Sequence, residues 1–396
     1  MTAINQRNGV IDSAPELIVF ADDWGRHPSS CQHLVRRLRG EYRVLWVNSI
    51  GTRKLRLDVH TFRRACEKLR GWGRGMTAAD DSMSVFDVPM LPWFGNRSIR
   101  SANRWLVTRN IRRRMRALGF HNPVVLSTLP FVGWLLGDVG QSRTIYYCTD
   151  DYSQWPNADR DALEFSEQAM LRRADLVLAV SEHLMQRCGA AKRCEYFPHA
   201  VDFSHFSKVR TSEVPPELAR LPGPRIGFFG LVYEKLDFVL LEKIAKQFPD
   251  ASLVLIGRVD SRPDSLADLP NVHLLGPKPY EELPRWIGGL DVLLMPYVLD
   301  DMILRSNPLK MRECLATGIP TVSVDVPEAR RFVPHIRVAA SHDEFLAAVR
   351  NSLSEGDDAG KAAARQQVVA SETWDARARQ LSDYIQSLQS LVPIAC

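Results

Sequence analysis

The sequence predicts an α/β protein built from two doubly wound domains in tandem. Its 396 residues exceed what one hydrophobic core usually supports. Short apolar runs alternate with helical patterns almost from end to end, which is typical of parallel sheets covered by helices on both faces. A stretch rich in proline and polar residues interrupts this rhythm near the middle. We therefore expect domains at residues 1–205 and 206–375, and a closing helix at 376–396 that packs against the body.

The strands of the first domain are expected where short, mostly apolar runs lie between helical segments. Because these runs are apolar without alternation, they indicate a parallel sheet that is buried on both faces. The predicted strands are residues 16–20, 43–47, 84–88, 123–127, 143–148 and 175–180.

The second domain repeats the pattern after the interrupting stretch, which begins near Phe197. Two such sheets leave a cleft between the carboxyl ends of their strands, and ligands of doubly wound sheets bind at that edge. The predicted strands are residues 225–230, 251–257, 271–276, 291–296 and 320–324.

Cysteine usage and hydropathy bear on the compartment. The seven cysteines are scattered, with no Cys-x-x-Cys pair and no zinc-like spacing to histidine, which indicates a reduced, cytosolic setting. The amino terminus lacks a basic start followed by an apolar core, and the most apolar window, Val124–Gly137, is too short and interrupted to span a bilayer. We expect a cytoplasmic protein.

Positive charge is concentrated between Asn96 and Gly119, where there are eight arginines and no acid. Apolar residues recur there at helical intervals, so the segment is predicted to be a basic amphipathic helix. Such a helix either packs one face on its own domain and leaves the arginines in water, or rests on anionic lipid headgroups. Nucleic acid is not expected as a partner, because no reader motif accompanies the charge.

The stretch SNPLKMRECLATGIP, residues 306–320, is typical of a loop that begins a helix. Ser306 and Asn307 are good amino-terminal caps, and Pro308 fits the first turn because it has no N–H to lose. Gly318 is expected to end the helix in a left-handed conformation. A helix start of this kind binds anions through its unpaired N–H groups and its dipole.

Charged residues at this helix start favour a phosphate site. Arg305 and Lys310 add positive charge, and Glu313 lies one turn deeper on the same face, where its carboxylate could accept two hydrogen bonds from a diol. The sequence thus predicts a phosphate at the helix tip with a ribose beside it. The alternative is an ordinary capped helix carrying a Lys310–Glu313 surface ion pair.

A weaker anion signal follows the strand that ends at Gly230, where a turn carries Lys235 ahead of the next helix. The sequence contains neither G-x-G-x-x-G nor G-x-x-x-x-G-K-[ST]. Hydride transfer with a dinucleotide and hydrolysis at a P-loop are therefore not supported.

The ordered blocks GFFG…K, LVLIGR, VHLLGPKPYEELPRWI, DVLLMPY and NPLKMRECLATGIPTV resemble the donor-binding half of glycosyltransferase family 4, retaining enzymes of the GT-B fold. The blocks FADDWGRHPSS, IYYCTDDYSQWP, ADLVLAVSEHL and PHAVDF resemble the acceptor half of bacterial polysaccharide-building members. The resemblance implies a GT-B architecture of two Rossmann-like domains, the first binding the acceptor and the second a nucleotide sugar.

By position, the resemblance implies roles for several residues of the second domain. Lys235 and Lys310 would contact the diphosphate of the donor, and Glu313 the ribose hydroxyls. The backbone near Arg258 and Lys278–Tyr280 would contact the base. Lys310 would also act in catalysis.

Two departures from the family pattern alter this expectation. The family usually has arginine after the glycine at 230, where this chain has Leu231, and an acid where this chain has Arg305. Diphosphate anchoring is therefore expected to shift to Arg305, with Gly230 and Ser306 completing the donor site.

The acceptor half offers Asp150 and Asp151 after the strand that ends at residue 148. The resemblance implies that these catalytic carboxyls orient the attacking hydroxyl. Alternatively, they cap the next helix or close a turn, or they bind a metal as a pair. No metal or other cofactor is expected, because GT-B enzymes generally offset leaving-group charge with helix dipoles and basic residues.

The loop after the first strand is the other candidate in this domain. Gly25 would allow close approach of a ligand to the backbone, and Arg26 and His27 would line the acceptor rim. His27 and His199 are more simply explained as satisfied surface residues.

These observations together predict a retaining glycosyltransferase, cytoplasmic and peripheral at the inner face of the membrane. It would move a sugar from a nucleotide-diphosphate donor to a hydroxyl of a glycan or lipid-linked glycan in polysaccharide biosynthesis. A GT-B sugar-nucleotide epimerase and a non-catalytic sugar-nucleotide-binding protein remain the alternatives.

Overall fold

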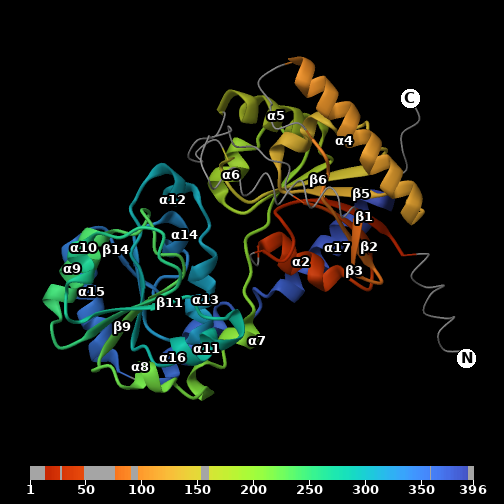
Figure 1. The fold of residues 1–396 in the computed structure, drawn as a ribbon. Helices are drawn as coiled ribbons and strands as arrows, with labels where there is room; N and C mark the ends of the chain where they lie inside the picture. Colours follow the sequence, from red (N-terminus) through yellow and green to blue (C-terminus); the bar gives the residue numbers. More distant parts are fainter. Residues whose placement is uncertain are drawn as a thin grey trace, which may run out of the picture. The chain divides into compact units, whose positions relative to one another are not determined.

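The computed structural model describes residues 14–26, 29–48, 76–90, 97–152, 160–356 and 358–390. The chain forms two compact units (Figure 1). The first unit contains Met1–Pro198 together with Trp374–Cys396, and the second contains His199–Thr373. The units divide at Pro198/His199 and Thr373/Trp374, whereas the boundaries expected from the sequence lie after residues 205 and 375.

The first unit is built on an eight-stranded sheet in the order β3-β4-β2-β1-β5-β6-β7-β8. All neighbouring strands are parallel except β3 and β4, which pair antiparallel. The strands are β1 (Glu16–Phe20), β2 (Arg43–Val47), β3 (Met76–Asp80), β4 (Met83–Phe86), β5 (Val124–Ser127), β6 (Arg143–Cys148), β7 (Leu176–Ala179) and β8 (Cys194–Tyr196).

Every predicted strand of this unit is present, and β3 and β8 were not predicted. β3 has the sequence MTAAD, which has no continuous apolar run, and β8 is only three residues long. Their pairing to neighbours, not their own apolar character, makes them strands. The helices of the unit are α2 (Ser30–Leu38), α4 (Arg97–Leu118), η1 (Pro130–Trp134), α5 (Arg160–Arg173), α6 (Glu182–Arg187) and α17 (Trp374–Ser390).

The terminal helix α17 packs on the first unit, beside α2 (Figure 1). The ring of Trp374 stacks on that of His33 with centroids 5.0 Å apart, and the hydroxyls of Tyr42 and Ser382 lie 2.8 Å apart. The chain therefore returns from the second unit to close the core of the first.

The predicted basic helix is α4, and its two faces differ as expected. Val107 and Ile111 are fully buried against the unit. The opposite face carries Trp105, which is 62% exposed, and the exposed residues Arg109, Arg112 and Arg116. These four residues recur at helical spacing and form what we call the α4 stripe. No helix of the described residues is long and apolar enough to cross a bilayer.

The second unit is built on a six-stranded parallel sheet in the order β11-β10-β9-β12-β13-β14. Its apolar strands form one core with the helices that cover them. The strands are β9 (Arg225–Phe229), β10 (Ser252–Ile256), β11 (Val272–Gly276), β12 (Val292–Met295), β13 (Thr321–Val324) and β14 (Arg337–Ala339). The first five were predicted, whereas the three-residue β14 was not.

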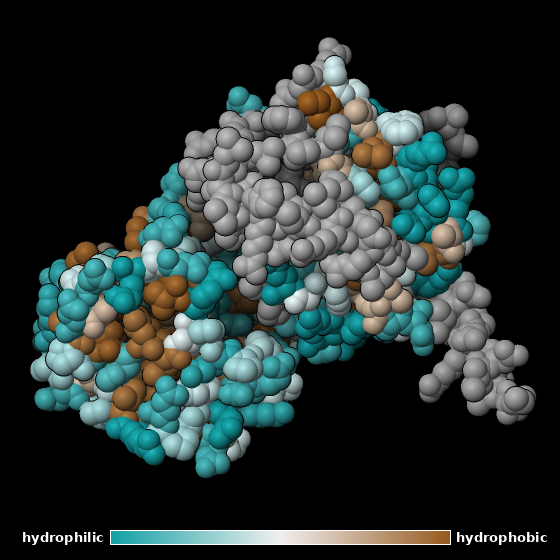
Figure 2. Space-filling model, viewed as in Figure 1, coloured by the Kyte–Doolittle hydropathy of each residue, from teal (hydrophilic) through white to brown (hydrophobic). Residues whose placement is uncertain are grey.

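The connections of the second unit are mostly helical, and several are single turns. Figure 2 shows apolar side chains gathered on the visible face of this unit. The helices are α7 (Phe203–Phe206), η3 (Val209–Thr211), α8 (Pro216–Ala219), α9 (Phe238–Gln247), α10 (Asp264–Ala267), η4 (Tyr280–Glu282), α11 (Leu283–Ile287), α12 (Asp301–Arg305), α13 (Leu309–Thr317), α14 (Pro327–Arg330), α15 (His342–Glu355) and α16 (Ala359–Gln367).

Candidate functional site

The carboxyl edge of the second sheet is opened by glycines. Because β9, β10 and β11 are parallel, their ends meet at one edge, where Gly230, Gly257 and Gly276 have φ of +136°, +150° and +67°. A Cβ at Gly257 would lie 1.7 Å from the carbonyl oxygen of Gly230. Only glycine therefore allows the ends of β9 and β10 to approach this closely.

Lys310 lies directly over this edge. A Cβ at Gly230 would lie 3.0 Å from both Cε and Nζ of Lys310, so the lysine side chain passes close to the glycine backbone. Its Nζ is 3.9 Å from the ring centroid of Phe229 and 5.6 Å from that of Phe228. The ammonium group is thus fixed against aromatic faces at the end of β9.

Lys310 and Glu313 form an ion pair, with Nζ 3.6 Å from Oε2. Such a pair was expected if α13 were an ordinary capped helix. Their side chains are only 16% and 15% exposed, so this is not a solvated surface pair. Partial burial strengthens the interaction and limits the conformations of both groups. The pair therefore presents a preset cation and carboxylate beside Gly230.

The beginning of α13 differs from the prediction. Ser306 is not its cap: the residue ends α12, and its hydroxyl donates to the carbonyl of Ile303 at 2.9 Å. Asn307 is buried and accepts a hydrogen bond from Arg312 at 2.7 Å. Pro308 itself is the N-cap, with an extended ψ of 115°, and Asn307 stays outside the helix because the residue before a proline favours extended backbone.

A consequence of this arrangement is that no side chain among the described residues caps the first turn of α13. The first N–H groups of the helix remain able to bind an anion, and Lys310 lies in the same turn. The other end is as predicted, since Gly318 ends the helix with φ of +75°.

Two further predicted cations are paired with acids of α12. Lys235 donates to Asp300, the N-cap of α12, and Arg305 lies 2.8 Å from Asp301. Burial opposes ionisation of Asp300, but its hydrogen bonds from Lys235 and the helix backbone hold its pKa below the ordinary value. Sequence reasoning missed these acids, although Asp300 and Asp301 before the apolar run at 302–304 are a helix-start signal.

The residues predicted to meet a base follow β10 and β11 at the same edge. Arg258 pairs with Asp260 at 2.7 Å and is largely exposed. The ring of Tyr280 stacks on that of His205 with centroids 4.3 Å apart, and His205 Nε2 lies 2.9 Å from the Tyr280 carbonyl oxygen. The Nζ of Lys278 lies over the ring of Trp286 at 3.7 Å.

In the first unit, Asp150 and Asp151 follow β6 at its carboxyl end. Asp151 is buried and pairs with Arg187 of α6, with 3.6 Å between Oδ1 and Nη1. This ion pair ties Asp151 to α6. Burial, together with the neighbouring charge of Asp151, raises the pKa of Asp150 from 3.8 to about 7. The described residues contain no group of three or more acids, histidines or cysteines arranged to bind a metal.

The loop after β1 is organised by Asp22. Its carboxylate accepts from Ser29 Oγ at 2.7 Å and from Gln32 Nε2 at 2.5 Å. Burial raises the pKa of Asp22 despite these hydrogen bonds. Gly25 has φ of +76° and its N–H donates to Gln32 Oε1 at 3.1 Å, so the predicted rim glycine is tied to the start of α2.

The structure gives less support for a site at the remaining candidates, Arg26, His27 and His199. Arg26 lies 3.5 Å from Asp23 and is partly exposed. His27 lies outside the described residues. His199 is buried, and this burial together with the charge of Arg312 lowers its pKa to about 3, which makes it a neutral interior residue.

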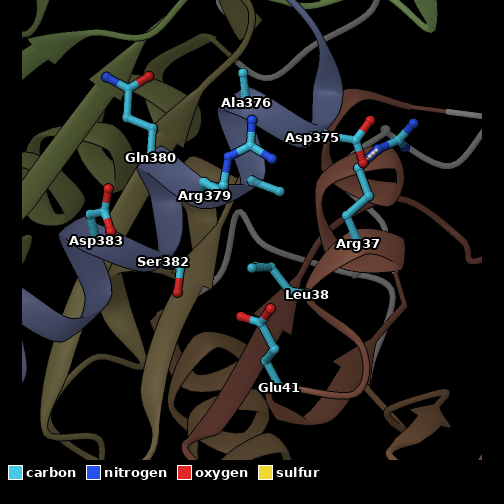
Figure 3. Close-up of a pocket in the computed structure, with 10 residues that line it drawn as sticks. Arg37, Leu38, Glu41, Asp375, Ala376, Arg379, Gln380, Ser382 and Asp383 are labelled. Carbon is cyan, nitrogen blue, oxygen red and sulfur yellow. Dashed lines mark hydrogen bonds and ion pairs between the residues drawn. The ribbon is translucent and has the colours of Figure 1, made fainter. Parts of the chain in front are cut away.

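A hollow of about 680 Å³ lies between α2 and α17 (Figure 3). It is lined by charges of both signs, and Arg37 bridges to Asp375 at 3.0 Å. Leu38 and Glu41 on its wall precede β2, so the hollow lies toward the amino ends of the strands. Ligands of doubly wound sheets bind at the opposite edge, and we assign no role to it.

Comparison with known proteins agrees with these features. Residues 223–355 match the family model described as glycosyl transferases group 1. Over 238 residues the chain is 25% identical to TuaH of Bacillus subtilis (strain 168), which is assigned as a teichuronic acid biosynthesis glycosyltransferase. That match covers 57% of this chain and 60% of TuaH.

Solved structures resemble the whole chain. Sucrose-phosphate synthase from Thermosynechococcus elongatus has a TM-score of 0.69 at 14% identity, covering 96% of this chain and all of that chain. Anabaena HepE in complex with UDP and glucose has a TM-score of 0.63 at 14% identity, covering 94% of this chain and 99% of that chain.

A third structure, the E. coli trehalose-6-phosphate protein bound with UDP-2-fluoro glucose, has a TM-score of 0.66 at 13% identity. It covers 96% of this chain and all of that chain. These likenesses show the fold, and the family model shows the domain. The chain has the GT-B fold, and its residues 223–355 match the group 1 glycosyltransferase family.

Proposed function

We propose that the protein is a retaining glycosyltransferase that moves a sugar from a nucleotide-diphosphate sugar to a hydroxyl of a glycan or lipid-linked glycan. Polysaccharide biosynthesis is the proposed setting, supported by the similarity to TuaH. HepE was solved with UDP and with UDP-glucose, which supports a nucleotide sugar as donor. The nucleotide sugar is a substrate, and the proposal assigns the protein no metal or other cofactor.

The observation that carries the proposal is the position of Lys310. Its ammonium group lies beside the Gly230 backbone at the start of α13, a helix end that no side chain of the described residues caps. Helix N–H groups, the helix dipole and a fixed cation thus converge where the parallel strands end. This arrangement suits a diphosphate, and Glu313 is placed one turn deeper for ribose hydroxyls.

The proposed mechanism is electrostatic. As the bond between the sugar and the diphosphate stretches, negative charge develops on the leaving group. A preset cation and helix N–H groups stabilise that charge more in the transition state than in the bound donor, which is the condition for faster turnover. Lys235 and Arg305 would add to this field when the diphosphate competes with Asp300 and Asp301 for them.

The proposed acceptor group is the carboxyl pair Asp150 and Asp151. A hydroxyl that attacks the sugar must lose its proton, and a carboxylate within hydrogen-bond reach orients it and takes that proton. A pKa of about 7 for Asp150 allows this residue to hold or release a proton near neutrality.

We further propose that the α4 stripe rests on anionic lipid at the cytoplasmic face of a membrane. Its arginines are exposed, and Trp105 presents a large apolar ring beside Arg109, whose guanidinium carbon lies 5.3 Å from the ring centroid. Exposed tryptophan and arginine on one helix face suit the headgroup region of a bilayer. This position would bring a lipid-linked acceptor to the protein.

The test of the proposed function is Lys310→Ala. Removing one donor that stabilises a developing charge costs roughly 3 kcal/mol in barrier, or about a hundredfold in turnover. Turnover is measured as nucleotide release from a panel of UDP-sugars with glycan acceptors. Lys246→Ala is the matched control, because Lys246 is a 63% exposed lysine of the same unit. Wild-type turnover in folded Lys310→Ala would reject the assignment.

A further inference from the structure

Arg187 connects two buried acids of the first unit. Its Nε and Nη2 donate to Glu167 Oε2 at 3.1 and 2.7 Å, and its Nη1 lies 3.6 Å from Asp151 Oδ1. Glu167 also accepts from the Tyr146 hydroxyl at 3.1 Å. One network therefore joins β6, α5, α6 and the loop that carries Asp150.

Burial makes the charged groups of this network costly in free energy unless each of them is paired. The side chains of Glu167 and Asp151 are only 7% and 3% exposed, and buried carboxylates are costly unless paired and hydrogen-bonded. Burial opposes the charge on Arg187 too, but its hydrogen bonds to Glu167 and the charges of both acids raise its pKa. The guanidinium fork is held by Glu167 on one side and directed at Asp151 on the other.

We propose that Arg187 is a positioning residue, which fixes Asp151 as a carboxylate next to Asp150 so that the pair meets the acceptor hydroxyl in one defined geometry. The inference rests on the proposed function only for the identity of that hydroxyl. Arg187 acts through Asp151 and is itself held by Glu167, a residue that the sequence patterns did not single out. The sequence signal that could have identified Glu167 is an acid whose neighbours on the same helix face are mostly apolar.

The arrangement divides the work between the two carboxyls. Asp151 has the guanidinium as its counter-ion, while burial and the charge of Asp151 together raise the pKa of Asp150 to about 7. Among the described residues, Tyr152 and Cys148 are further titratable groups beside Asp150, and the Cys148 thiol donates to the Asp150 carbonyl at 3.9 Å. The pair therefore offers a fixed acceptor and a proton-bearing neighbour at the end of β6.

The test is a titration of the Asp150 carboxyl by ¹³C NMR in the full chain, with the signal assigned by its loss in Asp150→Asn. Arg187→Gln removes a cation from the pair, so the midpoint is expected to rise by about one pH unit. Arg187→Lys restores the charge and is expected to keep the wild-type midpoint. Asp151→Asn removes the neighbouring anion, so the midpoint is expected to fall.

If the role of Arg187 were purely structural, Arg187→Gln would lower the stability of the chain but leave the Asp150 midpoint at its wild-type value. That result in the folded variants would overturn the inference. Should Arg187→Gln not fold, Asp151→Asn decides, since it leaves the Arg187–Glu167 pair intact; an unchanged midpoint there would overturn the inference as well. Calorimetric titration of the same samples with UDP tests the donor site separately. Absence of UDP binding would count against the proposed function and not against the network.

Discussion

Replacement of Asp150 by asparagine should change how stability depends on pH. In the folded chain, burial and the charge of Asp151 raise the pKa of Asp150 from 3.8 to about 7. The folded state then holds the proton more tightly than the unfolded state. This contribution to stability is fully present below pH 3.8, declines as pH rises, and is lost above about pH 7.

The magnitude follows from the linkage relation. One unit of pKa corresponds to about 1.4 kcal/mol, so the whole rise is worth on the order of 4 kcal/mol. Between pH 5 and pH 8 the wild-type chain should lose about 3 kcal/mol of unfolding free energy through this one group. The asparagine side chain cannot ionise, so the variant should lack this loss. The unfolding free energy of the variant minus that of the wild type should therefore be larger at pH 8 than at pH 5, by about 3 kcal/mol.

The assay is urea unfolding of the full chain at pH 5, 6, 7 and 8, with wild type and Asp150→Asn measured side by side. Groups that do not face Asp150 titrate alike in both proteins, so the difference between the two curves reports Asp150 together with its coupling to Asp151. A difference that stays constant across this pH range would refute the reasoning. It would mean that Asp150 ionises at its ordinary pKa, and that its surroundings and the charge of Asp151 do not raise that pKa as described.

Three further outcomes are expected. Glu313→Ala should weaken UDP binding in calorimetric titration, because the carboxylate for the ribose is lost; unchanged affinity would contradict that role. Gly257→Ala should lower the melting temperature and UDP affinity together, since its Cβ would lie 1.7 Å from the Gly230 carbonyl oxygen. Gly356→Ala is its control, with a positive φ but no atom within 4 Å of the added Cβ, and equal losses in both would reject the clash. Liposomes with anionic lipid should float the wild-type chain at low salt, and reversal of the three arginines of the α4 stripe should abolish this, as each basic residue contributes about 1 kcal/mol; equal flotation of both would end the membrane proposal.

Local patterns determined most of the elements. Continuous apolar runs are typical of strands that are buried on both faces, so most strands of both sheets followed from the local pattern alone. Gly318 ended its helix as predicted, because a left-handed residue is required at that point whatever surrounds it. The blocks of the second unit also carried the fold and the glycosyltransferase domain. Short strands such as β3 were missed because their neighbours make them strands.

The tertiary structure decided which charges meet. Lys235 finds Asp300 across 65 residues, and Lys310 is placed against Gly230 across an even longer stretch. Nothing in the local sequence distinguishes these contacts from solvated charges, since a side chain's partner depends on where distant strands end. Arg187 and Glu167 show the same limit, because their role comes from two helices packed beside β6. The sequence by itself therefore determined most of the elements and the edge of the sheet where ligands bind, whereas packing alone determined the geometry of the charged groups at that edge.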